Sequence, residues 1–433
     1  MRIQSFSSLI DYLNSYSYPV DKTIIRENRI LRIKLLLSHF NNPENSFKAI
    51  HIAGSKGKGS MANFLANAIT SLGYKCGLYT SPHVYSYKER FTLSGTFFSD
   101  EQFIRIGNII KDKLEDFNLP KEYGQAKPTN FELYTLLAYL LFKDSNCEYA
   151  VIETGLGGRL DSTNTLSSIA SIIMPIELEH TAILGNTLSE IALEKAKIIK
   201  KNQKVFTAKQ EKDALEVIQK EAKENNSELF LPSYEITNIL ETIEGQNIRI
   251  KYQDNTSYNL NMKMRTKAQA DNIALAISIL KELELFNENK SIKALENTQT
   301  IARFQSFDYL NNKFILDTAH TKNSMRNTIE TFTSLFKGEK TIIFATLIDK
   351  DITSMLNIIN SNFTNIILSK PGDFKESNME AVYNLIKDKH DSVHLILDNK
   401  AALDKALQFN NPTLICGSFY LAEYFYGVFN EFK

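Results

Sequence analysis

Cysteine is scarce in this sequence: Cys76, Cys147 and Cys416 are the only three among 433 residues. They lie far apart and are odd in number, so their spacing supports neither a disulfide framework nor a cysteine metal site. A reducing compartment suits such a chain best, and we expect the protein to be cytoplasmic.

An excess of charge and long apolar runs are also missing. Lysine plus arginine and aspartate plus glutamate each number 50, which gives a formal net charge of zero. Dedicated nucleic-acid-binding proteins usually have a basic excess, so we expect no nucleic-acid partner. The start, Met1 to Tyr18, holds serines and Asp11 where a signal peptide needs an apolar run. The longest apolar stretch, Phe131 to Phe142, contains Glu132 and is too short to span a bilayer, so we expect no membrane partner.

The chain has a globular composition, with 43% hydrophobic residues, and it is too long for a single core. From Phe47 onward, apolar runs of strand length alternate with helical periodicity, which predicts a mostly parallel, doubly wound α/β sheet. Alternating runs around Asp254 and Asn255 then predict an antiparallel hairpin. A second alternation predicts a smaller, Rossmann-like α/β domain, and we expect domains at 1–296 and 297–433. The expected strands are 49–53, 74–79, 149–153, 169–176 and 204–208 in the first domain, and 314–316, 341–345, 365–368, 393–397 and 413–415 in the second.

A glycine-rich loop follows the first expected strand. Gly54, Gly57 and Gly59 surround Lys58, and a helical pattern begins at Ser60. In such a loop, backbone N–H groups and the start of a helix face an anion, and the lysine adds a full charge, so the segment indicates a phosphate site. The spacing differs from the Walker pattern, because only two residues separate Gly54 from Gly57. The alternative is a strand-to-helix turn without a ligand.

Polar residues follow four expected strands of the first domain. They are Lys58 and Ser60, Ser81 and His83, Glu153, and His180. The carboxyl ends of parallel strands share one edge of a sheet, so we expect these residues to converge on one nucleotide. A carboxylate and a hydroxyl beside phosphate oxygens suit Mg²⁺. Taken singly, each has an alternative role as a turn cap, a turn residue or a solvated histidine. From its neighbours alone, Lys195 is one lysine of a charged helix face.

Longer motifs extend over nearly the whole chain. They are His51-Ile-Ala-Gly-Ser-Lys-Gly-Lys-Gly-Ser60, Tyr79-Thr-Ser-Pro-His83, Glu89-Arg90, Phe131-Glu132, Glu153-Thr-Gly-Leu-Gly-Gly-Arg-Leu-Asp-Ser-Thr-Asn164, Glu179-His180-Thr181, Ile183-Leu184-Gly185, Glu194-Lys195-Ala196, Arg303-Phe304, Leu316-Asp317-Thr-Ala-His320, Asp349-Lys350-Asp351 and Gly417-Ser418-Phe419-Tyr420. With these motifs the sequence resembles the folylpolyglutamate synthase/dihydrofolate synthase family of the Mur-ligase superfamily. The Thr-Ser-Pro-His and Gly-Leu-Gly-Gly-Arg-Leu-Asp runs separate it from the cell-wall Mur ligases.

The resemblance implies roles for individual residues. The ATP phosphates would lie on Gly57, Lys58, Gly59 and Ser60, and the nucleotide would contact Asn272, Arg303 and Asp317. Two Mg²⁺ ions would be bound by Ser81, Glu153, His180 and a carbamylated Lys195. The pterin of the acid substrate would lie along Thr129, Asn130, Phe131 and Glu132 and along Leu160, Asp161 and Ser162. The incoming glutamate would face His320 and Ser418, and the catalytic set would be Lys58, His180, Lys195 and His320.

The resemblance also implies an activity. The protein would be an ATP-dependent amide ligase that adds L-glutamate to a folate, with 7,8-dihydropteroate as a further candidate acceptor, through an acyl phosphate. We expect it to be a monomer. Two alternatives are open at this point: a ligase-inactive, nucleotide-binding regulatory protein, and a Mur-type amide ligase for another acid. The motifs also leave open the choice between folate and dihydropteroate and the length of the glutamate chain.

Three departures from the family pattern bear on the site. The family usually has Asn where Lys56 stands and Gly-Leu-Asp-His where Glu177–His180 stands. It usually has Gly where Thr318 stands, beside the residues that would contact nucleotide and glutamate. Because threonine lacks the φ freedom of glycine, this change predicts an altered geometry at the glutamate site.

Overall fold

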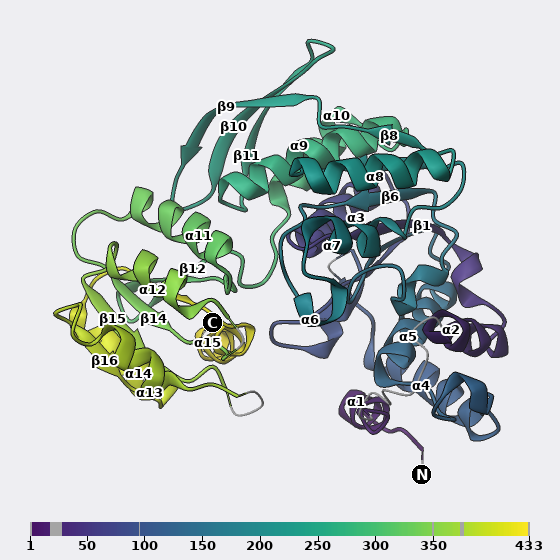
Figure 1. Ribbon diagram of the computed structural model, residues 1–433, viewed down its shortest axis with the longest axis horizontal. Helices are drawn as coiled ribbons and strands as arrows, with labels where there is room; N and C mark the ends of the chain where they lie inside the picture. Colours follow the sequence, from purple (N-terminus) through teal and green to yellow (C-terminus); the bar gives the residue numbers. More distant parts are fainter. Residues whose placement is uncertain (1, 18–27, 95, 349, 373–375, 432–433) are drawn as a thin grey trace. The chain divides into compact units, whose positions relative to one another are not determined.

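The computed structural model describes residues 2–17, 28–94, 96–348, 350–372 and 376–431. The chain divides into two compact units, Met1–Ser233 with Asn272–Leu295, and Tyr234–Asp271 with Glu296–Lys433. We describe each unit by itself (Figure 1). The domain boundary expected between 296 and 297 stays a prediction; the compact units group residues 234–271 with the C-terminal part.

The first unit is built on an eight-stranded sheet of order β4-β3-β2-β5-β1-β6-β7-β8. Its strands are β1 Lys48–Ala53, β2 Cys76–Tyr79, β3 Phe91–Leu93, β4 Thr96–Phe97, β5 Tyr149–Glu153, β6 Ala170–Ile173, β7 Lys204–Thr207 and β8 Glu228–Phe230. The six strands from β2 to β8 in this order pair in parallel, and β3 and β4 add antiparallel pairs at one edge. All five strands expected in the first domain are present, and the prediction of a mostly parallel sheet is confirmed.

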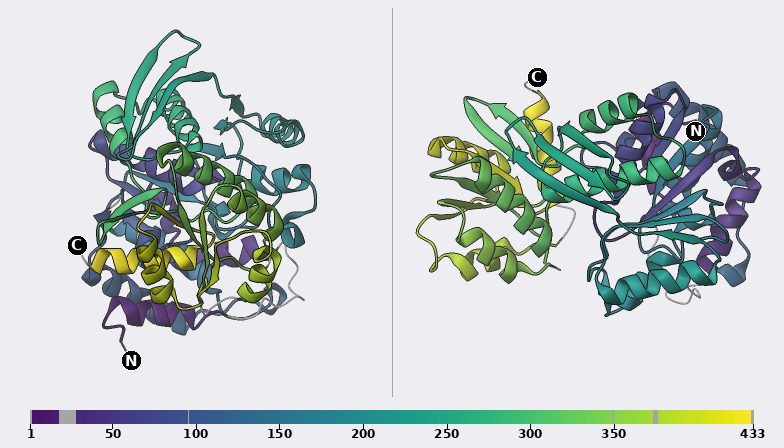
Figure 2. Two further views of the ribbon diagram at one scale, coloured as in Figure 1. Left: turned by 90° about the vertical axis from the view of Figure 1, so that its left-hand side faces the viewer. Right: turned by 90° about the horizontal axis from the view of Figure 1, so that it is seen from above.

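Helices cover both faces of this sheet (Figures 1 and 2). They are α1 Phe6–Asn14, α2 Asn28–His39, α3 Lys58–Ser71, α4 Asp100–Glu115, α5 Asn130–Asp144, α6 Thr181–Leu184, α7 Leu188–Ala196 and α8 Lys212–Glu224, together with most of α9 Lys267–Glu282 and α10 Glu288–Asn297. Helices α1, α2, α4 and α5 bury their apolar residues in one cluster with strand residues such as Tyr79 and Ile152. Helices α7 and α8 form another cluster with β6 and β7.

The strand order creates a switch point between β1 and β6. From β1 the chain passes through α3 to β2 on one side, whereas from β6 it passes through α7 to β7 on the other side. Ligands of open α/β sheets bind outside the carboxyl ends of the strands at such a point. The glycine loop after β1 and the 174–180 segment after β6 therefore occupy the position where this fold binds ligands.

The second unit contains two sheets. The hairpin expected around Asp254 and Asn255 is present as β10 Gln246–Tyr252 and β11 Ser257–Met262, and β9 Tyr234–Glu241 completes a three-stranded antiparallel sheet. The other sheet has the order β12-β13-β17-β14-β15-β16, with only β12 antiparallel to its neighbour. Its strands are β12 Gln305–Tyr309, β13 Asn312–Leu316, β14 Thr341–Phe344, β15 Asn365–Leu368, β16 Val393–Leu395 and β17 Thr413–Cys416. The expected second α/β domain is thus confirmed.

The helices of the second unit are α11 Lys322–Leu335, α12 Ile352–Asn360, α13 Met379–Ile386, α14 Asn399–Phe409 and α15 Phe419–Glu431. The last strand, β17, lies between β13 and β14, so the centre of this sheet is completed by the end of the chain. Met325 of α11, Met355 of α12 and Val382 of α13 are buried in one core cluster with residues of β13 to β15 and β17.

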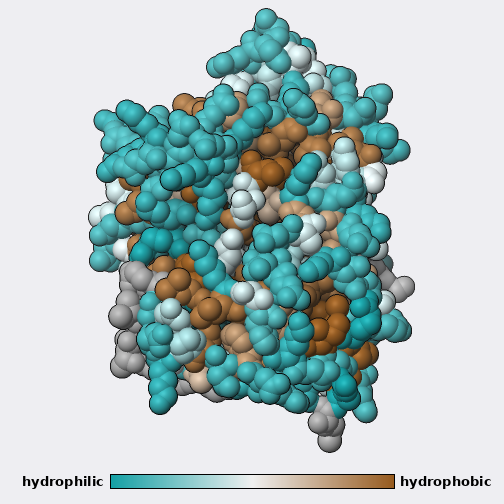
Figure 3. Space-filling model, turned by 90° about the vertical axis from the view of Figure 1, so that its right-hand side faces the viewer, coloured by the Kyte–Doolittle hydropathy of each residue, from teal (hydrophilic) through white to brown (hydrophobic). Residues whose placement is uncertain are grey.

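Figure 3 shows one face on which hydrophilic residues cover most of the surface and hydrophobic residues form separate, smaller patches. Among the helices that the structure describes, none is long and apolar enough to cross a membrane. All three cysteines are buried and have free thiols.

Gly77 on β2 offers a test of how tightly the first core is packed. A Cβ atom at this position would lie 2.5 Å from Cδ1 of Phe142 on α5. We expect Gly77→Ala to lower the free energy of unfolding by about 1–3 kcal/mol, because the buried ring must shift. In a Phe142→Leu background the same substitution should cost less, since leucine vacates part of the space. Urea unfolding of the four proteins measures both values, and an equal cost in both backgrounds would contradict this account.

Candidate functional site

The glycine loop adopts backbone conformations that favour glycine. Gly54 has a φ of 149° and Gly57 a φ of 81°. A Cβ on Gly54 would lie 2.5 Å from Cβ of Met174, so a larger residue does not fit there. The N–H groups of Ser55 and Lys56 donate to the carbonyl oxygen of Pro175 at 2.9 and 3.3 Å. The loop is therefore held against the segment after β6, and α3 begins directly after it with its N-terminus at the sheet edge.

Lys58, Glu153 and Ser81 are brought together at this edge. Nζ of Lys58 donates to the carbonyl oxygen of Gly54 at 3.0 Å and lies 3.9 Å from Oε1 of Glu153. Oε2 of Glu153 accepts the N–H of Ser81 at 3.1 Å. The carboxylate is only 5% exposed. Because Mg²⁺ prefers a few protein oxygens together with phosphate oxygens and water, this buried carboxylate beside a serine and a phosphate-type loop fits such an ion.

Lys195 is buried, so the interpretation drawn from its neighbours alone, that it is one lysine of a charged helix face, is wrong. Its side chain is 2% exposed, and Nζ donates to the carbonyl oxygen of Gly54 at 2.9 Å and to Oε1 of Glu179 at 3.1 Å. Burial, reinforced by the charge of Lys58 and partly offset by Glu179, lowers the pKa of Lys195 to about 8. The apolar residues Ile191, Ala192 and Ile199, at helical spacing around position 195, were the sequence signal for this burial.

Glu179 connects two departures from the family pattern. Its Oε1 accepts from Lys195, and its Oε2 lies 3.8 Å from Nζ of Lys56. Burial by itself would raise the pKa of Glu179, but the ammonium groups of Lys195, Lys58 and Lys56 outweigh burial and lower it. The unusual lysine and the unusual glutamate thus form an ion pair across the site.

Asn272 and His180 lie near the same sheet edge. Asn272 on α9 is buried, and a Cβ on Gly57 would lie 3.3 Å from its Oδ1, so the amide adjoins the glycine loop. His180 is exposed in a left-handed conformation, with a φ of 47°, directly before α6. Within the part of the chain that the structure describes, no group of three or more His, Cys, Asp or Glu residues is arranged to hold a metal ion.

The first of the two segments expected to line the acid substrate packs against the Gly155–Gly158 run, which precedes the second segment in the chain. A Cβ on Gly155 would lie 2.3 Å from Cζ of Phe131, so the ring of Phe131 at the start of α5 packs directly on this backbone. A Cβ on Gly158 would lie 2.8 Å from the carbonyl oxygen of Glu194, so the run also packs closely on α7. The specific Gly-Leu-Gly-Gly run is therefore explained by close packing between two helices. The adjoining site candidates Leu160 and Ser162 are half-buried in this run.

Both carboxylates expected at the acid-substrate site are already engaged by the chain. Oδ2 of Asp161 accepts the N–H of Leu156 at 2.8 Å, and Oδ1 accepts the N–H of Thr163 at 3.0 Å. Oε2 of Glu132 accepts the N–H of Thr129, the N-cap residue of α5, at 2.6 Å. Asn130 donates its N–H to the carbonyl oxygen of Tyr16 at 3.2 Å. These interactions shape the two segments.

Arg32 on α2 organises the chain that leads into α5, and the sequence interpretation missed it. The guanidinium, 2% exposed, donates to Oε1 and Oε2 of Glu132 at 3.2 and 3.3 Å. It also donates to the carbonyl oxygens of Tyr123, Gln125 and Lys127 at 2.8–2.9 Å. All five N–H donors of arginine are therefore used. Arg32 lies in a buried stripe of α2 with Ile33, Leu36 and Leu37, which was the only sequence signal.

The Ser-Pro-His and Glu-Arg motifs form one structure after β2. The carboxylate of Glu89 accepts the N–H groups of Val84, Tyr85 and Ser86 at 2.6–2.9 Å.

His83 and Arg90, the other members of these motifs, contact each other. Nε of Arg90 donates to Nδ1 of His83 at 2.8 Å, and the guanidinium lies over the rings of Tyr87 and Tyr134. Burial and the nearby guanidinium lower the pKa of His83 to about 4, so the imidazole is neutral at physiological pH.

In the second unit, the expected site residues gather at the carboxyl ends of β13 and β17. Asp317 is buried and accepts the N–H groups of Phe304 and Ala319 at 2.8 and 2.7 Å. Burial raises the pKa of Asp317, although Arg303 and these hydrogen bonds oppose the shift. Gly417, with a φ of 110°, follows β17, and a Cβ there would lie 2.2 Å from the carbonyl oxygen of Ala345.

Arg303, His320 and Ser418 complete this group. Arg303 donates to the hydroxyl of Thr318 and lies over the ring of Phe419. Nδ1 of His320 donates to the carbonyl oxygen of Thr318 at 2.9 Å. Ser418 is buried. Thr318 has a negative φ, so it replaces glycine without backbone strain, and its hydroxyl supplies a partner for Arg303.

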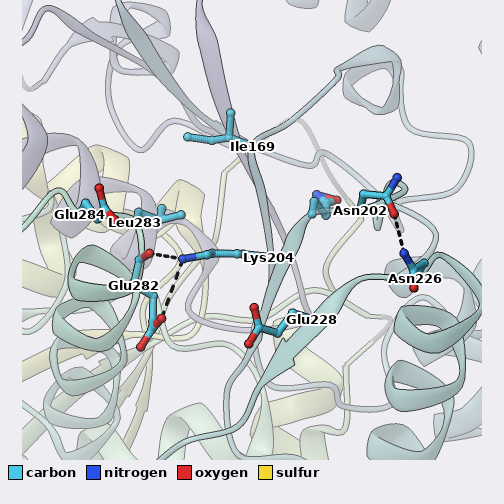
Figure 4. Close-up of a pocket in the computed structure, with 9 residues that line it drawn as sticks. Ile169, Asn202, Lys204, Asn226, Glu228, Glu282, Leu283 and Glu284 are labelled. Carbon is cyan, nitrogen blue, oxygen red and sulfur yellow. Dashed lines mark hydrogen bonds and ion pairs between the residues drawn. The ribbon is translucent and has the colours of Figure 1, made fainter.

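A separate hollow of about 520 Å³ lies at the opposite edge of the first sheet (Figure 4). It is lined by the residues that open β7 and β8, by Ile169 before β6 and by the end of α9. Lys204 points to Glu282 there and donates to its carbonyl oxygen, and Asn226 donates to Asn202 at 2.7 Å. Because it faces the amino ends of the parallel strands, this hollow is not part of the candidate site.

Comparison with known proteins supplies an independent assignment. The family described as Mur ligase, glutamate ligase domain, matches residues 302–419. The chain is 32% identical to the dihydrofolate synthase/folylpolyglutamate synthase of Bacillus subtilis over 334 residues, which are 75% of this chain and 77% of the relative. It is 30% identical to the probable dihydrofolate synthetase of Schizosaccharomyces pombe over 415 residues, 90% of this chain and 95% of the relative.

Solved structures agree with these relatives. Folylpolyglutamate synthase of Thermotoga maritima has a TM-score of 0.82 at 27% identity, and the match covers 93% of this chain and 94% of that one. The apo form of the L. casei enzyme has a TM-score of 0.85 at 25% identity, covering 98% and 99%. The likeness therefore extends over both units.

Arg32 provides a test of the buried ion pair. We expect Arg32→Lys to lower the free energy of unfolding by about 2–4 kcal/mol, because lysine has three donors and leaves buried carbonyl groups without partners. Arg105→Lys is the matched control, since Arg105 makes an exposed bidentate pair with Asp144 at 2.6 and 2.7 Å. That change should cost less than about 1 kcal/mol. Urea unfolding gives both values, and equal losses would show that Arg32 has no special structural role.

Proposed function

Because this chain belongs to the dihydrofolate synthase/folylpolyglutamate synthase family of ATP-dependent ligases, we propose that it uses ATP to join L-glutamate to a folate, with 7,8-dihydropteroate as a second acceptor. The observation that carries the proposal is the grouping of Lys58, Ser81, Glu153 and Lys195 around the glycine loop. We further propose that it acts as a monomer in the cytoplasm.

The chemistry explains why a nucleotide is needed. A carboxylate is a poor electrophile, because oxide would have to leave. In the proposed reaction, an oxygen of the acid attacks the γ-phosphorus of ATP and ADP leaves, which gives an acyl phosphate. The amine nitrogen of glutamate then attacks the acyl carbon, phosphate leaves and the nitrogen loses a proton, which completes the amide. Negative charge builds on phosphoryl oxygens during both steps, so positioned cations provide much of the catalysis.

The first unit would bind the phosphates. Backbone N–H groups of Gly57, Gly59 and Ser60 at the start of α3 would face the phosphate oxygens. Lys58 would exchange its hydrogen bond with Gly54 for a phosphate oxygen, which requires only a side-chain rotation. Asn272 would contact the nucleotide from its position beside Gly57.

Metal binding would use Ser81, Glu153, His180 and a modified Lys195. Glu153 already accepts the N–H of Ser81, so the two residues lie close enough to share one ion. When bound, Mg²⁺ supplies positive charge to the phosphoryl oxygens. His180 would join Ser81 and Glu153 as a magnesium ligand, and carbamylated Lys195 would supply an oxygen near a second ion. The buried site of Lys195, where the ammonium form is disfavoured, supports carbamylation of its amine.

The remaining proposed contacts concern the acid and glutamate. The pterin would lie along Thr129 to Glu132 and along Leu160 to Ser162. Phe131 of the first segment packs on Gly155, and the next residue, Leu156, donates its N–H to Asp161 of the second segment. In the second unit, Arg303 and Asp317 would contact the nucleotide, and His320 and Ser418 would face glutamate. Of all the proposed site residues in the two units, the catalytic set is Lys58, His180, Lys195 and His320. The retained grouping around the glycine loop supports an active ligase over a ligase-inactive regulatory protein.

ADP release across a panel of acids tests the proposal. We expect release only when ATP, glutamate and either folate or 7,8-dihydropteroate are all present, and none with a cell-wall precursor acid. Lys58→Ala should lower turnover by about a hundredfold or more, because one charge at the phosphates is lost. Lys212→Ala, an exposed lysine on α8, is the control and should change nothing. ADP release at the same rate with and without the folate-type acid would refute the proposed substrate.

Carbamylation of Lys195 is tested separately. The neutral amine attacks CO₂ and loses a proton, so at constant dissolved CO₂ the carbamate should increase as pH rises through about 8, the pKa of this lysine. We expect a carbamate signal with ¹³C-labelled CO₂ that is absent in Lys195→Ala. That variant should bind ATP yet lose most ligase activity, and acetate or formate should restore part of it by filling the vacated anion position. A fully active Lys195→Ala variant would remove the residue from the mechanism.

A further inference from the structure

A chain of hydrogen bonds runs from the middle of β1 to the loop after β5. Nε2 of His51 lies 2.8 Å from Oγ1 of Thr163, and that hydroxyl lies 2.6 Å from Oδ1 of Asp161. His51 and Thr163 are fully buried, and Asp161 is 5% exposed. Thr163 belongs to the short 3-10 helix η4, Ser162–Thr165, which packs against α2 and α5. The proposed phosphate site includes none of the three residues.

The direction of these hydrogen bonds follows from the donors available. Oδ1 and Oδ2 of Asp161 accept backbone N–H groups of Thr163 and Leu156, and the N–H of Gly155 also faces this carboxylate. A group surrounded by N–H donors acts as an acceptor, so the single hydroxyl proton of Thr163 points to Asp161. Oγ1 of Thr163 must then accept from His51, which places the proton of the neutral ring on Nε2. Burial lowers the pKa of His51 to about 3, in keeping with a neutral ring.

This assignment explains a buried atom without a partner. Nδ1 of His51 is buried and, among the residues that the structure describes, has no hydrogen-bond partner. In the tautomer derived above, Nδ1 carries a lone pair and no proton. Leaving a buried acceptor unpaired has a cost, and such groups in native structures call for an explanation. We explain the unpaired Nδ1 by the hydrogen bond at Nε2. That bond fixes the tautomer of His51 and holds the hydroxyl of Thr163 toward Asp161.

Asp161 connects the whole loop. Its carboxylate joins the backbone at Gly155 and Leu156 to the backbone at Thr163, so its rotamer sets the shape of the run between them. Gly155 in that run packs on the ring of Phe131. A rotation of Asp161 would therefore change the surface on which the acid substrate is proposed to lie, whereas the glycine loop would keep its own contacts with Pro175.

We propose that His51 and Thr163 are positioning residues for the acid substrate: through Asp161 they hold the 155–163 loop in the shape that binds the acid. This inference rests on the proposed function, because it takes the loop to be the acid site. The residues act on binding of the acid and leave binding of ATP unchanged.

Thr163→Val and Thr163→Ser form a matched pair for the test. Valine keeps the shape of threonine and removes the hydroxyl, whereas serine keeps the hydroxyl. We expect Thr163→Val to raise KM for the folate-type acid by about tenfold, with KM for ATP within about twofold of the wild-type value. Thr163→Ser should keep the wild-type KM for the acid. An unchanged KM for the acid in Thr163→Val, or equal rises for acid and ATP, would overturn the proposal.

A second measurement does not depend on how the valine variant folds. Nitrogen-15 NMR of the wild-type protein, with the His51 signals identified by their loss in His51→Gln, reports the tautomer. We expect a proton on Nε2 and none on Nδ1, and the opposite tautomer would overturn the proposed direction. Wild-type protein that releases no ADP with a folate-type acid would refute the proposed function, which is a different outcome from an active enzyme that is insensitive to Thr163→Val.

Discussion

The carbonyl oxygen of Gly54 accepts hydrogen bonds from two lysines, Lys58 at 3.0 Å and Lys195 at 2.9 Å, and the arrangement of the first site depends on it. The oxygen can take this position because Gly54 adopts a conformation that favours glycine and packs against Met174, where no Cβ fits. Lys58 comes from the first turn of α3 and Lys195 from the last turn of α7. One backbone group thereby connects the glycine loop with two helices that are far apart in the sequence.

The charges around this oxygen are nearly balanced. Lys56, Lys58 and Lys195 contribute three positive charges, and Glu153 and Glu179 contribute two negative ones, which leaves a single net positive charge when all are ionised. Buried ammonium groups with carboxylate partners avoid most of the cost of an isolated charge. A bound triphosphate would bring several negative charges to this site. A metal cation bound at the carboxylates of Glu153 and Glu179, in addition to the three lysines, would therefore be favoured electrostatically. Burial, together with the nearby charge of Lys58, lowers the pKa of Lys195, so its amine is more easily deprotonated than that of an ordinary lysine.

The departures from the family pattern are accommodated by new partners. Lys56 and Glu179 stand where the family usually has Asn and Asp, and they form an ion pair at 3.8 Å. Thr318 stands where the family usually has Gly, and its hydroxyl accepts from Arg303 without a strained backbone. The loss of glycine's φ freedom matters only at a positive φ, and Thr318 has a negative φ. In each case a changed side chain contacts another residue of the same site.

The sequence by itself determined the two α/β sheets, the hairpin and the glycine loop, because buried strands need apolar runs, helices need a 3.6-residue repeat and a tight turn at a phosphate needs glycine. The rule that parallel strands end on one edge also predicts Ser81 and Glu153 near the loop, and in the structure Glu153 contacts both Ser81 and Lys58. Only the tertiary structure decided which charged side chains are buried. Lys195 and Arg32 lie in apolar stripes of their helices, yet their partners, the carbonyl oxygen of Gly54 and the chain before α5, are distant in sequence. A charged residue is buried only where such distant groups meet it, and local periodicity carries no information about them.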